Sequence, residues 1–61
     1  MLVLARQVGQ QIIMEHEGVM IVVEVVSMRH GEVKIGVEAP KSVSVDRREI
    51  WLKRKRDEEA G

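Results

Sequence analysis

The chain has 61 residues, and its ten basic and ten acidic side chains give a formal net charge of zero. It contains no cysteine, phenylalanine or tyrosine, and Trp51 is its single aromatic residue. A chain this short buries only about 60% of its unfolded surface. Without cysteine it has neither disulfides nor a thiolate metal site, so oligomerisation is the remaining way to enlarge its core.

The first half of the chain is rich in strand signals. Strands are predicted over residues 1–7, 11–15 and 19–28, because each stretch combines apolar and β-branched residues between turn signals. Gly9 separates the first two strands, and residues 16–18 form a turn before the third. The longest apolar run, residues 19–23, is far too short to span a bilayer, so no membrane partner is expected.

Two more strands and a helix are predicted in the second half. A turn over "RHGE" precedes a strand over residues 33–38, in which valine and isoleucine alternate with other residues. Pro40 ends that strand, and residues 42–46 form a fifth. Asp46 followed by Glu49 is a capping-box pattern, which predicts a helix over about residues 47–57 and a frayed, charged tail to residue 61.

This mostly-β arrangement of five strands and a C-terminal helix forms one domain over residues 1–61. Valine and isoleucine on both faces of residues 19–26 indicate burial on both sides of that strand. The first and fifth strands are expected at the edges of the sheet, where unpaired backbone groups invite another chain. Strand exchange into a homodimer would cover these edges and enlarge the core.

Two segments carry distinctive motifs: "MLVLARQVGQ" opens the chain, and "VKIGVEAPKSVSVDRREI" contains IGV, APK and RxEI at fixed spacing. Both segments resemble the carbon storage regulator (CsrA/RsmA) family of bacterial post-transcriptional regulators. The resemblance implies an interlocked homodimer that binds GGA-containing loops of messenger RNA, commonly over a ribosome-binding site. It also implies capture by small regulatory RNAs and leaves room for a protein antagonist.

The resemblance further implies that the first strand of one subunit and the fifth of the other form the RNA-binding surface. The RNA-binding residues carried over, or adjoining that strand, are Leu4, Arg6, Val43, Ser44, Val45, Arg47 and Arg48. Arg47 stands at the most important arginine of the family. This chain has a middle section that is a few residues longer than usual, an aspartate at position 46 where histidine is frequent, and Arg48 where an acid is frequent.

The residues support RNA binding independently of the family. Residues 41–61 hold seven basic and five acidic side chains, whereas residues 1–40 hold three and five, so the basic excess lies around Arg47. A strand edge offers backbone N–H and C=O groups to unpaired bases, and an arginine offers a planar fork for phosphate or guanine. The absence of phenylalanine and tyrosine argues against a platform of stacked aromatic residues.

Simpler structural roles stand beside each of these assignments. Arg47 and Arg48 could be solvated residues at a helix start, Arg6 a solvent-facing strand residue, and Leu4 a packing residue. The "KRKR" run is typical of a solvated helical face that attracts phosphate without specificity. Trp51 is expected to pack at the helix base, and Met14, Met20 and Met28 to fill the core.

An enzyme is not expected, because the chain has no cysteine nucleophile, no triad-like spacing and no glycine-rich phosphate loop. No cofactor or metal is expected, since His16 and His30 are turn residues. The absence of cysteine fits a cytoplasmic protein. The competing class is a protein-interaction module, in which the helix and an exposed strand dock a regulatory partner.

Overall fold

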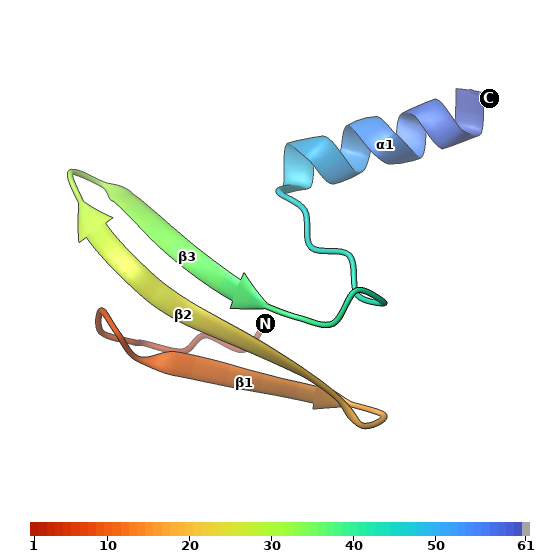
Figure 1. The fold of residues 1–61 in the computed structure, drawn as a ribbon. Helices are drawn as coiled ribbons and strands as arrows, with labels where there is room; N and C mark the ends of the chain where they lie inside the picture. Colours follow the sequence, from red (N-terminus) through yellow and green to blue (C-terminus); the bar gives the residue numbers. More distant parts are fainter. Residues whose placement is uncertain (61) are drawn as a thin grey trace.

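The computed structural model describes residues 1–60, which form a three-stranded antiparallel sheet followed by a helix (Figure 1). The strands are β1 (Gln11–His16), β2 (Val19–Arg29) and β3 (Glu32–Glu38), and the helix is α1 (Arg48–Ala60). The sheet order is β1-β2-β3, so the long valine-rich β2 lies in the centre. The second, third and fourth predicted strands are therefore confirmed, and no bound differs from its prediction by more than one residue.

Both hairpins close through tight two-residue turns. Glu17 and Gly18 have φ angles of 50° and 78°, and His30 and Gly31 have φ angles of 48° and 77°. Positive φ at both central residues is the type I′ geometry, whose twist matches that of the flanking strands. Glycine takes this conformation without a Cβ penalty, which explains its place at the second position of each turn.

The pairing of β2 with β3 contains one irregularity. Val25 pairs with Ile35 and Ser27 with Lys34, which leaves Val26 as an extra residue on β2. This is a β-bulge, which bends the strand and increases its twist. Val26 Cγ2 lies only 3.2 Å from where a Cβ on Gly36 would stand, so a side chain at this position would require Val26 to move by a few tenths of an ångström.

Residues 1–7, predicted as the first strand, form no ladder in the single chain. A turn in which Gln10 N donates to Gln7 O (3.0 Å) brings this segment back along β1 (Figure 1). Gly9 N then donates to Val25 O at 2.8 Å, which ties the turn to β2. No backbone hydrogen bond pairs residues 1–6 with any other part of the described chain. An extended segment becomes a strand only when a partner backbone satisfies its polar groups.

The predicted fifth strand, residues 42–46, also has no ladder partner within residues 1–60. Val43 N donates to Pro40 O at 3.0 Å, so Ser42 lies inside a turn and not in a strand. The prediction over residues 42–46 is therefore wrong for Ser42 in the single chain. The rest of the segment is irregular between this turn and the helix.

The helix is longer than predicted, and its start is different. Arg47 O accepts from Ile50 N (3.1 Å) and Trp51 N (3.0 Å), which makes Arg47 the N-cap residue. The predicted capping box is wrong, because the described residues contain no hydrogen bond from a backbone N–H to the carboxylate of Asp46 or Glu49, and the Asp46 carboxylate pairs with Arg54. Helix continues to Ala60 where a frayed tail was predicted, since arginine, lysine, glutamate and alanine all favour helix.

Gly61, the end of the predicted tail, lies outside the described residues. Among residues 1–60, no helix has the length and apolar character needed to cross a membrane.

None of the described side chains is buried, so the single chain has no hydrophobic core. Leu2 and Val3 are each 81% exposed, and the predicted core residues Met14, Met20 and Met28 are about half exposed. The accessible surface is 5844 Å², whereas a compact protein of this mass exposes about 4,000 Å². The radius of gyration is 14.3 Å, against about 10.5 Å for a compact chain of this length.

The helix does not compensate for the missing core. Figure 1 shows α1 standing away from the sheet, and none of the described strands lies close enough to pack against it. Ile50, Trp51 and Leu52 are consequently 44–47% exposed, so the predicted packing of Trp51 at the helix base is incomplete in one chain.

We expect Gly31→Ala to lower the free energy of unfolding by about 1–2 kcal/mol, because alanine at a φ of 77° places its Cβ against the backbone. Gly31→Asn should cost less, since asparagine tolerates this conformation. Denaturant titration at one fixed protein concentration measures both. Apart from its chain neighbours, no atom lies within 4 Å of a Cβ at this position, so any loss of stability comes from the backbone conformation. Equal stability of Gly31→Ala and the parent chain would therefore contradict the type I′ assignment.

Candidate nucleic-acid interface

The candidate RNA-binding residues fall into two groups that lie outside the sheet. Leu4 and Arg6 belong to the N-terminal segment, and the others lie in residues 43–48, from the segment after the sheet to the first residue of α1. No backbone hydrogen bond joins residues 1–7 to residues 42–47 within the described chain. The two groups are thus both accessible, but one chain does not pair them.

Leu4 lines an open, mostly apolar hollow of about 400 Å³ between the N-terminal segment and the sheet. The other lining residues are Leu2, Ile12, Ile13, Met14 and Val23. Leu4 itself is 53% exposed. Arg6 is exposed as well, and its Nε donates only to the neighbouring Ala5 O at 3.0 Å, so the guanidinium has no acidic partner among the described residues.

Residues 43–45 present an open stretch of backbone. Val43 is half-buried and its N–H is occupied by Pro40 O, whereas Ser44 and Val45 are exposed. Neither Ser44 nor Val45 makes a backbone hydrogen bond within residues 1–60. The small Ser44 side chain leaves these N–H and C=O groups accessible to the edge of a base or to another strand.

Arg47 connects this open backbone to the helix. Its carbonyl receives the first hydrogen bonds of α1, which fixes its backbone, while its side chain is 77% exposed. Arg47 Nε lies 3.4 Å from Glu49 Oε1. Since both partners are exposed, this ion pair is weak and leaves Arg47 available to a stronger ligand. Arg48, also exposed, is the first residue of the helix.

A second ion pair lies beside Arg47, and sequence reasoning missed it. Arg54 Nη1 is 3.0 Å from Asp46 Oδ2. The Asp46 side chain is only 20% exposed. The capping-box pattern drew attention to Asp46, but it assigned the carboxylate to backbone N–H groups and gave no sign of Arg54.

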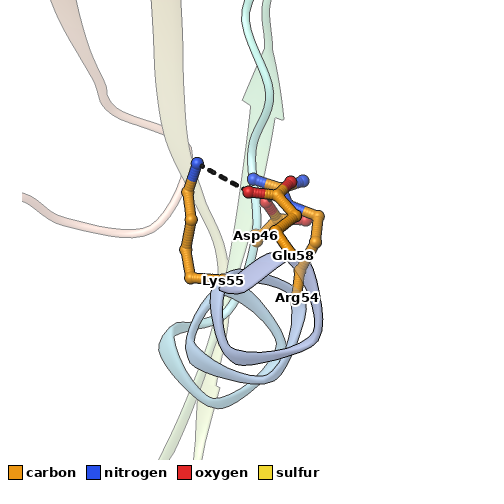
Figure 2. A network of polar contacts seen from close by, with 4 residues as sticks. All are labelled: Asp46, Arg54, Lys55 and Glu58. Atoms are coloured by element: carbon orange, nitrogen blue, oxygen red, sulfur yellow. Dashed lines mark hydrogen bonds and ion pairs between the residues drawn. The ribbon is translucent and has the colours of Figure 1, made fainter. Parts of the chain in front are cut away.

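The rest of the helix is strongly polar. Lys55 Nζ lies 3.3 Å from Glu58 Oε2 (Figure 2) and 5.8 Å from the centre of the Trp51 ring. Arg56, in contrast, forms no ion pair with the described residues. Within residues 1–60, no three histidine, aspartate or glutamate side chains are grouped in a way that could hold a metal ion.

Comparison with known proteins assigns the family. Residues 1–56 match CsrA, a global regulator protein family, and this match includes both groups of candidate residues. The chain belongs to the CsrA family. The predicted resemblance to CsrA proteins is thereby confirmed, since more than nine-tenths of the chain takes part in the match.

Two relatives illustrate the similarity. The translational regulator CsrA of Thermosipho africanus is 45% identical over 51 residues, which are 84% of this chain and 66% of that protein. The translational regulator CsrA of Thermosipho melanesiensis is also 45% identical over 51 residues, covering 84% of this chain and 64% of that protein. The matched part of the chain thus spans slightly less than two thirds of the length of these relatives.

Proposed function

We propose that this CsrA-family protein is an RNA-binding regulator of translation that acts as a homodimer. It binds GGA-containing loops in messenger RNA leaders, blocks ribosome access there, and is titrated by small RNAs that carry such loops. The observation that carries the proposal is the open backbone of residues 43–45 ending at the exposed Arg47 guanidinium. Family membership and the names of the two relatives support translation as the regulated process.

The missing core supports the homodimer. A compact protein of twice this mass exposes about 6,700 Å², while two separate chains at 5844 Å² each expose far more. Dimerisation would therefore bury about 5,000 Å² in total, which is the size of an obligate interface. The apolar hollow beside Leu4 is one of the surfaces that the second copy would cover.

Strand exchange accounts for the two segments without ladder partners. In the proposed dimer, residues 1–7 of one chain pair with residues 43–46 of the other, which completes five strands in each half. Each segment offers backbone groups that the single chain leaves without partners in a ladder. The pairing also brings Arg6 of one chain beside Arg47 of the other, so each RNA site would contain residues from both chains.

Recognition of GGA would rely on hydrogen bonds instead of aromatic stacking. Unpaired bases expose their edges in RNA loops, and backbone amides and carbonyls can read them. Arg47 adds a planar donor for phosphate or for a guanine edge. A fixed backbone at the N-cap of α1 reduces the entropy that Arg47 loses when it binds RNA.

The dimer proposal predicts that folding and association are one transition. Sedimentation equilibrium at micromolar concentration should give twice the chain mass. The midpoint of thermal unfolding should rise by about 5 °C for each tenfold increase in protein concentration, because mass action favours the dimer. A folded monomer whose melting temperature does not depend on concentration would contradict the exchanged dimer.

The site proposal predicts that Arg47→Ala weakens binding of a GGA hairpin by about 1–3 kcal/mol or more, the range for an arginine that reads a base edge. Stability should change by no more than about 0.5 kcal/mol, because the side chain is 77% exposed. Arg56→Ala is the matched control, since it removes the same charge from an exposed position on the same helix. Fluorescence titrations and thermal melts measure both quantities.

A hairpin in which GGA is replaced by CCA provides the RNA control. The parent protein should bind it much more weakly, while Arg56→Ala should reduce binding to both hairpins slightly and equally. If Arg47→Ala remains dimeric and binds the GGA hairpin as tightly as the parent, the site assignment is wrong. The alternative function, docking of a protein through the exposed Ile50, Trp51 and Leu52, would then be favoured.

A further inference from the structure

We propose that Arg54 acts as a positioning residue of the RNA site by holding the carboxylate of Asp46 away from Arg47. This inference rests on the proposed function, because it concerns how Arg47 is kept available to RNA. Arg54 lies in the middle of α1, and its partner Asp46 immediately precedes Arg47 in the chain. Neither residue is among those predicted to contact RNA.

The geometry requires Arg54 to reach back along the helix. It is the seventh residue of α1, about 9 Å along the axis from the first residue at a rise of 1.5 Å per residue. Helical side chains point towards the helix N-terminus, so the Arg54 guanidinium can meet a residue that precedes the helix. The 3.0 Å contact with Asp46 thus bridges the open segment and the second turn of α1.

Burial distinguishes this ion pair from the others. The Asp46 side chain is 20% exposed and that of Arg54 is 41% exposed, whereas Arg47 and Glu49 are 77% and 66% exposed. Partial removal from water strengthens the attraction between opposite charges. Asp46 is therefore held more firmly than Glu49, and of the two acids beside Arg47 only Glu49 is easily displaced by RNA.

The neighbouring charges leave Arg54 free for this role. Glu58, one helical turn further on, is engaged by Lys55 at 3.3 Å (Figure 2). Asp57 and Lys53 line the same side of the helix as Arg54 and differ in sign, so they contribute no net charge there. Asp46 is the partner that Arg54 contacts at hydrogen-bonding distance.

Local charge shows what would follow from losing Arg54. Asp46, Arg47, Arg48 and Glu49 sum to zero, and Arg54 makes this cluster positive by one charge. Without Arg54, the Asp46 carboxylate would be a free anion one residue from Arg47. It would compete with RNA phosphates for the Arg47 guanidinium and repel the RNA backbone.

The test is a double-mutant cycle on binding of the GGA hairpin, with Arg54→Ala, Asp46→Asn and the two combined. Arg56→Ala is again the control, because it measures the effect on RNA affinity of losing one positive charge from the helix. Arg54→Ala should weaken binding at least about threefold more than Arg56→Ala, the coupling expected of residues in direct contact. Adding Asp46→Asn should restore binding to the level of Arg56→Ala, because the competing carboxylate is gone.

The ion pair is absent from both Arg54→Ala and the double variant, so a purely structural role would leave both with the same RNA affinity. Recovery of affinity on adding Asp46→Asn therefore separates the positioning role from a structural one. Sedimentation and melts establish that each variant is folded, and Arg54→Gln replaces Arg54→Ala if the latter does not fold. Equal affinities for Arg54→Ala and Arg56→Ala, or a double variant no tighter than Arg54→Ala, would overturn the proposal.

The parent protein and Arg47→Ala separate this inference from the proposed function. If the parent prefers GGA over CCA and Arg47→Ala loses that preference, the function stands even where the cycle shows no rescue. If the parent does not distinguish the two hairpins, the proposed function fails and the role of Arg54 fails with it.

Discussion

The hydrophobic effect is the constraint on which the rest of this structure depends, because one chain has apolar surface that it cannot cover. None of the described side chains is buried, and the sheet presents valine, isoleucine and methionine on surfaces that the helix does not reach. Apolar area of this extent is stable in water only when a partner removes it from solvent. Local interactions, such as the type I′ turns at Gly18 and Gly31, set the hairpins, and in the proposed dimer association supplies the core.

The same constraint links folding to function. The segments that lack a ladder in the single chain, residues 1–7 and 43–46, are also those that carry the candidate RNA-binding residues. In the proposed dimer, the hydrogen bonds that complete the sheet also bring Arg6 and Arg47 together. The binding site would then exist only in the assembled protein, so a chain that failed to associate would bind RNA poorly even with every contact residue intact.

Charge distribution bears on the proposed RNA binding. A chain with zero net charge cannot rely on general attraction to a polyanion, so the proposed binding requires a local excess of positive charge. Arg47 and Arg48 lie at the start of α1, and Arg54 in its second turn engages the nearby Asp46 carboxylate. The acids Asp57 to Glu59 follow the basic run of residues 53–56, so the basic side chains of α1 lie between Arg48 and Arg56.

The sequence by itself determined the three central strands, their turns, the presence of a C-terminal helix and the family, and it supplied the candidate contact residues. Alternation and β-branched residues marked the three central strands, glycine marked the turns, and the IGV, APK and RxEI motifs marked the family. The Val26 bulge was not predictable, because it depends on how β2 registers against β3. Nor was the Asp46–Arg54 pair, since a capping pattern fits any nearby donor and only the path of the chain before α1 selects Arg54. Residues 1–7 and 42–46 were not predictable either. Their composition favours strands, but a strand exists only where a second backbone satisfies its hydrogen bonds. The tertiary structure places no such backbone beside them within the described chain.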